Sequence, residues 1–234
     1  MSVFARVVDR LRAPRRLDPD VAARLGAWQA LREPDLARAH AEIRYVVVDT
    51  ETTGLDLRHD RLIAIGAASV RGLALPLADG FDVILRQDEA SADANILIHG
   101  IGGQAQLGGA APATALVDFL AFAGKAPLVA FRAEFDASVI ERAARAHLGL
   151  SLARRWIDLA FLLPALFPGN EARTLEDWLA IFSIPAGERH YAVADAYACG
   201  ELLLLALTEA ARKGMATPAD LLSMQKAQQW LGRR

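Results

Sequence analysis

Two acidic residues at the end of an apolar run are the first feature of this sequence that could carry chemistry. The segment VVVDTETTG, residues 46–54, places Asp49 and Glu51 two positions apart after three valines. Side chains alternate faces along a strand, so both carboxylates would lie on the same face. Adjacent carboxylates repel unless one is protonated or a cation lies between them, and Mg²⁺ or Mn²⁺ prefers such ligands. On this pair alone, two acids capping a turn at an exposed strand end are the more common explanation.

A third acid follows another apolar segment. Asp136 comes shortly after APLVAF, residues 126–131, and near the start of a predicted helix. The carboxyl ends of neighbouring parallel strands meet at one edge of a sheet, so we expect Asp136 to lie near Asp49 and Glu51. The alternative is an acid that is stabilised by the dipole of the helix whose first turn it occupies.

The segment HYAVAD, residues 190–195, adds a histidine and a fourth acid at the start of a long predicted helix. Alone, His190 would more often be a surface residue than a catalyst. Together with three acids and Asp195 it becomes a candidate general base, because the ordinary pKa of a histidine is about 6.5. Tyr191 lies four residues before Asp195, which leaves a second assignment open. We find no Ser/His/Asp pattern that competes, and Cys199 lies inside an apolar helix.

Alternating and periodic apolar patterns indicate the elements that must position these residues. Strands are predicted at residues 44–51, 61–70, 80–86, 126–131 and 155–159. Helices are predicted at residues 113–124, 133–149, 160–167, 174–182 and 218–232, with a long one ending near Lys213. Three strands in a meander, followed by strands that alternate with helices, predict an α/β fold with a mixed five-stranded sheet flanked by helices. The glycine-rich segment 100–112 is predicted to be a loop, and it lacks the spacing of a phosphate-binding loop.

The segments on either side of the predicted sheet look helical. Residues 1–43 are expected to form an N-terminal helical extension, residues 44–212 the sheet domain, and residues 213–234 a C-terminal helical tail. Within the extension, Asp18 is the expected N-cap and Pro19 the first residue of a helix, and Pro34 is expected to open a further short helix. The basic amphipathic start is expected to pack on its own protein rather than on a membrane.

Composition sets limits on the class of protein. The chain has 234 residues, of which 53% are hydrophobic, and a formal net charge of −2, so it can form one sizeable core and is not basic overall. The single cysteine excludes an internal disulfide and fits a reducing compartment. No signal-peptide pattern or membrane-spanning run is present in the sequence. We therefore expect a cytoplasmic protein without a membrane partner.

Four segments taken together resemble the DEDDh exonuclease family, the group that includes the DNA polymerase III epsilon subunit, RNase T and oligoribonuclease. They are DTETTG, IHGI at 98–101, FD at 135–136 and HYAVAD. The resemblance covers roughly residues 44–211 and implies a ribonuclease H-like fold. It also implies a 3′→5′ exonuclease that releases 5′-mononucleotides from single-stranded DNA or RNA with two Mg²⁺ or Mn²⁺ ions. Such a pair of ions activates a water and stabilises the leaving oxygen.

The resemblance also implies roles for individual residues. Asp49, Glu51, Asp136 and Asp195 would be the metal ligands, and His190 the base. The pocket for the 3′-terminal nucleotide would be lined by Thr52, Thr53, Gly54, Leu55, His99 and Ile101. Family members usually carry a polar pair such as His-Asn where this chain has Phe131 and Arg132, so Arg132 is the candidate to hold a phosphate there. Ala64 stands where a glutamate is common.

Two other functions remain open at this stage. The first is a non-catalytic module that grips a strand end or a polymerase, although the intact set of four acids and His190 argues against it. The second is a proofreading subunit of a DNA polymerase, in which the helical ends are docking elements. The choice between DNA and RNA depends on contacts to the 2′-hydroxyl, which the sequence does not reveal.

Overall fold

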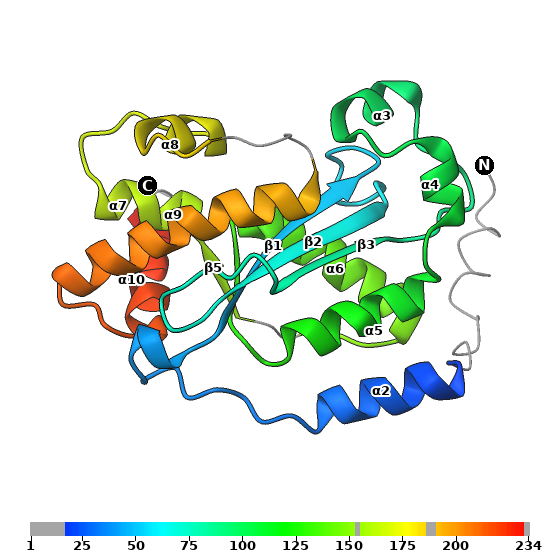
Figure 1. Cartoon of the computed structure of the whole chain (residues 1–234), viewed down its shortest axis with the longest axis horizontal. Helices are drawn as coiled ribbons and strands as arrows, with labels where there is room; N and C mark the ends of the chain where they lie inside the picture. The colour runs from blue at the N-terminus through cyan, green and yellow to red at the C-terminus, as the bar shows by residue number, and fades with distance from the viewer. Residues whose placement is uncertain (1–16, 153–154, 186–190, 232–234) are drawn as a thin grey trace.

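A single mixed sheet forms the centre of the molecule (Figure 1). The computed structural model describes residues 17–152, 155–185 and 191–231. The strand order is β3-β2-β1-β4-β5, with β2 antiparallel to both β1 and β3, and with β4 and β5 parallel to β1. The strands are β1 (Tyr45–Thr52), β2 (Leu62–Val70), β3 (Gly80–Ile84), β4 (Leu128–Ala130) and β5 (Trp156–Asp158). The predicted α/β fold with a mixed five-stranded sheet is therefore confirmed.

The central strand β1 is buried on both of its faces, which explains the run of valines. Val46 and Val48 belong to the hydrophobic cluster on one side of the sheet, and Val47 belongs to the cluster on the other. All three side chains are at most 1% exposed. A strand buried in this way reads as a continuous apolar segment rather than as an alternating one.

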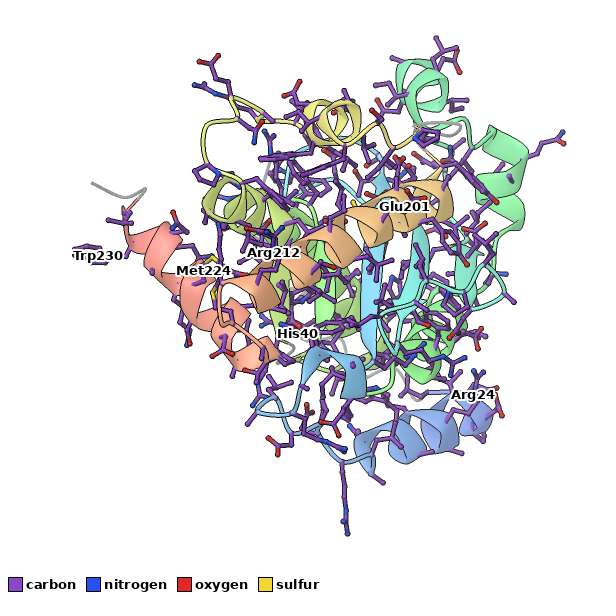
Figure 2. The ribbon with its side chains drawn as sticks, turned by 60° about the vertical axis from the view of Figure 1, so that its left-hand side comes forward. Arg24, His40, Glu201, Arg212, Met224 and Trp230 are labelled. Carbon is purple, nitrogen blue, oxygen red and sulfur yellow. The ribbon has the colours of Figure 1, made fainter. Side chains whose placement is uncertain are left out.

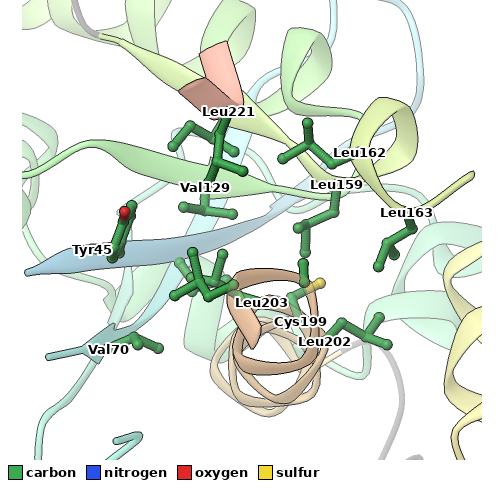
Figure 3. Close-up of a cluster of buried hydrophobic side chains, with 14 of the residues drawn as sticks. Tyr45, Val70, Val129, Leu159, Leu162, Leu163, Cys199, Leu202, Leu203 and Leu221 are labelled. Atoms are coloured by element: carbon green, nitrogen blue, oxygen red, sulfur yellow. The ribbon is translucent and has the colours of Figure 1, made fainter. Parts of the chain in front are cut away.

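One face of the sheet is covered by a long helix, α9 (Ala192–Arg212), together with α7 (Leu159–Leu166) and α8 (Leu175–Ile181). Figure 3 shows Leu202, Leu203 and Cys199 of α9 packed among residues of the strands and of α7. Helix α9 crosses both β1 and β2, so its first turn lies next to the carboxyl end of β1.

The opposite face is covered by α5 (Pro112–Ala123) and α6 (Ala133–Leu148), and α2 (Pro19–Gln29) packs on α5. Asp18 caps α2 as predicted, since its side chain accepts a hydrogen bond from the Asp20 amide. Trp28 is buried, and its indole N–H donates to the Gly124 carbonyl at 2.8 Å. Figure 2 labels Arg24 of the same helix, which pairs with Asp118 of α5.

The glycine-rich segment differs from its prediction, because it contains a whole short helix, α4 (Gly103–Gly108), which follows α3 (Asp93–His99). The buried Gln106 side chain holds this region together by donating to the Ile101 carbonyl at 2.8 Å and to the Ser91 hydroxyl at 2.9 Å. Gly100 ends α3 with a φ of 69°, a left-handed conformation that suits glycine. Bonds between residues fifteen positions apart are not visible in a local pattern.

The described parts of the two flanking segments contact the sheet domain and each other. No helix opens at Pro34 as predicted; instead a short 3₁₀ turn, η2 (His40–Glu42), precedes β1. The buried His40 ring (Figure 2) contacts the Tyr45 hydroxyl at 2.6 Å and the Met215 carbonyl at 3.2 Å. Helix α10 (Pro218–Leu231) packs on α7 and β5. The predicted divisions at residues 43 and 212 therefore stay predictions.

The predicted helix over the first residues of the chain lies outside the described residues. Within the part of the chain that the structure describes, no helix has both the length and the apolar character needed to cross a membrane.

Candidate functional site

Three carboxylates gather at the carboxyl end of β1. Asp49, Glu51 and Asp195 each place one oxygen within 4.8 Å of the others. Asp49 and Glu51 lie on the face of β1 that α9 covers, and Asp195 lies in the first turn of α9. Glu51 and Asp195 are buried, with 9% and 6% of their surfaces exposed. Carboxylates this close and this poorly hydrated repel one another strongly, so the arrangement favours a bound cation.

A glycine in β2 brings α9 close enough for this meeting. Gly66 pairs with Asp49 across the β1–β2 ladder. A Cβ on Gly66 would lie 2.1 Å from the carbonyl carbon of Ala192 and from the amide nitrogen of Val193. The first turn of α9 therefore rests directly on the Gly66 backbone, and no other residue type fits there without a shift of the helix. A glycine inside a strand pattern is a known sign of such close backbone approach.

Asp136 lies beside this group but is not one of its members. Its Oδ1 accepts a hydrogen bond of 2.7 Å from the Thr50 hydroxyl, which comes from the β1 residue between Asp49 and Glu51. Thr50 points to the α6 side of the sheet, so Asp136 approaches the strand end from the layer opposite α9. Burial raises the pKa of Asp136 to about 7, and the Thr50 hydrogen bond opposes that shift.

Of the two candidates for the base, the structure describes only Tyr191. His190 lies outside the described residues. The Tyr191 side chain is exposed, and its hydroxyl donates to Asp82 Oδ2 at 2.7 Å. Asp82 is on β3, two strands away from the strand that carries Asp49. The Tyr191–Asp82 hydrogen bond raises the pKa of the Tyr191 hydroxyl.

Residues 53–61, which we name the 53–61 loop, join β1 to β2 and include three of the predicted pocket residues. The Thr53 hydroxyl donates to Asp60 Oδ1 at 2.8 Å, and Gly54 packs so closely on the Asp60 carboxylate that a Cβ would lie 2.5 Å from it. The Thr52 hydroxyl donates to the Gly54 carbonyl at 2.6 Å. Leu55, at the tip, is 86% exposed. Asp60, which organises this turn, carried no signal in the sequence pattern.

The other predicted pocket residues lie at the end of α3. His99 is 4% exposed, and its Nδ1 accepts a hydrogen bond of 3.0 Å from the Ile101 amide. The neutral ring therefore carries its proton on Nε2, which faces the Ser91 hydroxyl at 3.3 Å. Burial lowers the pKa of His99, which also favours the neutral ring. Both ring nitrogens of His99 therefore face Ser91 and Ile101 inside the protein, where they stabilise the end of α3.

Arg132 occupies an unusual backbone conformation at the start of α6. Its φ of 61° is in the left-handed region, which costs a residue with a side chain about 1–3 kcal/mol. Asp158, which is buried, holds the turn by accepting hydrogen bonds from the Arg132 and Ala133 amides at 2.9 and 3.0 Å. The exposed Arg132 guanidinium donates to the Arg173 carbonyl at 3.2 Å. Sequence reasoning missed Asp158, although an acid between a strand and an apolar helix is a helix-cap signal.

The donor set fits a hard divalent cation. Asp49, Glu51 and Asp195 offer carboxylate oxygens alone, which suits Mg²⁺ or Mn²⁺ better than softer metals. Asp136 is linked to this set through its hydrogen bond with Thr50. The structure brings three of the four predicted ligands together, and Asp136 is bonded instead to Thr50, the residue between Asp49 and Glu51.

Comparison with known families gives one match that spans most of the sheet domain. The profile of the exonuclease (RNase T) family matches residues 46–203. Among characterised relatives, the DNA polymerase III PolC-type protein of Bacillus subtilis (strain 168) is 30% identical over 175 residues, which are 74% of this chain and 12% of that protein. The DNA polymerase III subunit epsilon-like protein of Rhodobacter capsulatus is 30% identical over 198 residues, covering 82% of this chain and 27% of that protein.

Solved structures with a similar fold include two nucleases bound to DNA. E. coli exonuclease I in complex with a dT13 oligonucleotide has a TM-score of 0.62 at 19% identity, covering 73% of this chain and 42% of that one. Exonuclease X in complex with 5′ overhanging duplex DNA has a TM-score of 0.61 at 19% identity, covering 77% of this chain and 99% of that one. At this level of identity the likeness is one of fold, and the chain spans less than a third of the two polymerase relatives named above.

Proposed function

This chain belongs to the exonuclease family, and on that premise we propose that it is a metal-dependent 3′→5′ exonuclease. Its substrates would be single-stranded DNA or RNA ends, and its products 5′-mononucleotides. The observation that carries the proposal is the convergence of Asp49, Glu51 and Asp195, with their oxygens within 4.8 Å, at one end of the sheet. Two of these acids are buried and Asp49 is half-buried, and carboxylates this close repel one another, so a bound cation explains the arrangement better than a purely structural role.

The four acids would hold two divalent ions, Mg²⁺ or Mn²⁺. When bound, these ions supply positive charge to the phosphodiester and lower the pKa of the attacking water. Asp49, Glu51 and Asp195 would bind the ions from the α9 side of β1, and Asp136 would add a fourth carboxylate from the α6 side. Four carboxylates balance the charge of two divalent ions, so the site would hold both ions without a large net charge, and the phosphate of the substrate would bind them as an additional oxygen ligand.

His190 would accept the proton of the attacking water. The proposal favours His190 over Tyr191, because the Tyr191 hydroxyl is engaged with Asp82 two strands from Asp49. A neutral imidazole is also a better proton acceptor near pH 7 than a phenol.

The 3′-terminal nucleotide would lie between the 53–61 loop and the end of α3. Leu55 is exposed enough to meet a base or sugar, and Thr52, Thr53 and Gly54 form the turn behind it. Ile101 and the buried His99 support the opposite wall. Arg132, which is exposed one strand away from β1, would hold a phosphate of the strand.

A second function within the same chemistry is proofreading for a DNA polymerase. It is supported by two relatives whose names are DNA polymerase III PolC-type and DNA polymerase III subunit epsilon-like protein. Co-purification of the chain with a polymerase catalytic subunit would support it. The cytoplasm is the expected location, in keeping with the single reduced cysteine, Cys199.

A digestion assay tests the main proposal. Labelled single-stranded DNA and RNA are incubated with the protein and Mg²⁺, with matched samples that contain EDTA or carry a 3′-phosphate. We expect 5′-mononucleotides from the free 3′ ends and no digestion in the EDTA or 3′-phosphate samples. Cleavage of circular single strands would contradict the proposal, and tight binding of strand ends without any cleavage would favour the non-catalytic module.

A further inference from the structure

An arginine of α6 holds the 53–61 loop from outside. The guanidinium of Arg142 donates through Nη1 to the Leu57 carbonyl and through Nη2 to the Asp60 carbonyl. Arg142 is half-buried, and none of the ion pairs among the described residues includes it. Its charge is therefore directed at two main-chain oxygens of this loop, and hydrogen bonds from a charged donor are roughly twice as strong as neutral ones.

Asp60 connects the Arg142 contact with the predicted pocket residues Thr53 and Gly54. While the Asp60 carbonyl accepts from Arg142, the Asp60 carboxylate accepts from the Thr53 hydroxyl at 2.8 Å and from the Asp56 amide at 2.7 Å. The same carboxylate lies against Gly54, where a Cβ would be 2.5 Å away. A displacement of Asp60 must therefore displace the turn formed by Thr53 and Gly54.

The loop has a second anchor on its other side. The Arg61 guanidinium donates to the Gln87 side chain and to the Glu89 carbonyl, both at 3.1 Å, in the segment that leads to α3. Arg142 connects the loop instead to α6, the helix whose first turn carries Asp136. The two anchors place the loop between the helix that bears an acid and the segment that leads to the opposite wall.

Leu55 depends on this arrangement for its position. Its side chain is 86% exposed, so packing against other described residues does little to hold it. Its location follows from the backbone of the 53–61 loop, which Arg142 and Arg61 tie down at both sides.

We propose that Arg142 is a positioning residue for the nucleotide pocket. It holds the 53–61 loop and Leu55 in a fixed position relative to the acids on β1 and α6. This inference rests on the proposed function for its substrate. Arg142 itself need not touch the nucleic acid. A lysine cannot replace it, because an ammonium group lacks the planar fork that reaches two carbonyls at fixed spacing.

Steady-state kinetics on single-stranded oligonucleotides separates positioning from chemistry. Arg142→Ala and Arg142→Lys are compared with Arg145→Ala and Arg145→Lys, one turn further along α6, where Arg145 pairs with Glu141 at 2.6 Å on the surface. We expect KM to rise about tenfold in both Arg142 variants while kcat changes by less than about threefold, the signature of lost binding that the ground state and the transition state share. Both Arg145 variants should match the wild type.

A double-mutant cycle identifies the route of the effect. If Arg142 acts by placing Leu55, then Arg142→Ala in a Leu55→Ala background should raise KM much less than it does alone, because the side chain to be placed is gone. Multiplicative effects of the two substitutions on KM would overturn the proposal.

Amide hydrogen exchange supplies a readout that does not need activity. In Arg142→Ala, protection should fall in residues 53–61 and stay unchanged in α9, whereas Arg145→Ala should leave both segments unchanged. If the wild type degrades no nucleic acid while loop protection still depends on Arg142, the proposed function fails and the structural link stands. If the wild type is active and Arg142→Ala changes neither KM nor loop exchange, the inference about Arg142 fails alone.

Discussion

The hydroxyl of Tyr191 donates a hydrogen bond of 2.7 Å to Asp82, on the strand two positions from the one that carries Asp49. Adjacent strands are about 4.8 Å apart, so this contact holds the phenol roughly 10 Å to the side of the Asp49 strand. Asp195, on the same first stretch of α9, reaches the acids on β1 instead. The polar side chains at the start of α9 are therefore divided between the edge strand β3 and the central strand β1.

The first prediction concerns the base. His190→Ala should reduce turnover by about 10²–10⁴-fold, the usual contribution of a general base, whereas Tyr191→Phe should remain active. Wild-type activity should also fall below about pH 6.5, where a histidine with an ordinary pKa becomes protonated. The measurement is the initial rate of mononucleotide release at several pH values. The opposite ranking of the two variants would assign the base to Tyr191.

The second prediction tests the contact between β2 and α9. Gly66→Ala would drive a methyl group into the backbone of Ala192 and should cost about 1–3 kcal/mol of stability. It should also lower activity by about 10²-fold, because a displacement of about 1 Å moves Asp195 relative to Asp49. Urea unfolding and oligonucleotide digestion measure the two effects. Gly26→Ala is the control, since no atom lies within 4 Å of a Cβ there; in the middle of α2 it should add up to about 1 kcal/mol.

The third prediction concerns the acids and the metal. Asp49→Asn should abolish digestion but leave the metal-free protein as stable as the wild type or more stable, because the substitution removes repulsion with Glu51 and Asp195. Mg²⁺ at one hundred times its Kd should stabilise the wild type by about 2.7 kcal/mol and so raise its melting temperature. The melting temperature of the variant should rise much less. Thermal unfolding with and without Mg²⁺ measures this. Equal metal stabilisation of both proteins would contradict the site.

The fourth prediction is a pH dependence of stability that is due to Asp136. Burial raises the pKa of Asp136 to about 7 in the folded protein, above the value of about 3.9 in an unfolded chain. The folded state thus binds this proton more tightly, so the stabilisation is complete below about pH 4 and is lost as the pH rises through 7. In EDTA, the wild type should lose about 3 kcal/mol relative to Asp136→Asn between pH 5 and pH 8.

Chemical unfolding at a series of pH values measures this difference. Asparagine can still accept the hydrogen bond from Thr50, which makes the variant a close match in shape. Saturating Mg²⁺ should reduce the pH dependence, because a nearby cation favours the carboxylate. Parallel stability profiles of the two proteins in EDTA would refute the assignment.

The fifth prediction concerns the N-terminal extension. Trp28→Ala should destabilise the protein by about 3–5 kcal/mol, because the indole is buried against α5 and donates to the Gly124 carbonyl. Helix α2 covers α5, away from the carboxyl end of β1 (Figure 1). The kcat of the folded variant, measured well below its melting temperature, should therefore equal that of the wild type.

Deletion of residues 1–43 should likewise leave activity on short oligonucleotides while lowering solubility. A large loss of kcat in a well-folded variant would place the extension in the catalytic function.

The sequence by itself was sufficient for the sheet, the long helices and the family, because these depend on local patterns. The valines before Asp49 predict a buried strand, the period of α6 and α9 predicts their helices, and the order of the four motifs is specific to the exonuclease family. Alternation along β1 also predicts that Asp49 and Glu51 lie on one face. The pattern did not show the helix inside the glycine-rich segment, because α4 is held by the side-chain bonds of Gln106.

Tertiary structure alone decided which acids meet and what supports them. In the sequence, Gly66 is only a residue that disfavours a strand. The structure shows that the backbone of α9 packs directly on it. The hydrogen bond between Tyr191 and Asp82 joins residues 109 positions apart. The bonds from Arg142 to the 53–61 loop join residues more than 80 positions apart. No periodic or neighbouring pattern encodes such contacts, because they depend on how separately formed layers pack across the sheet.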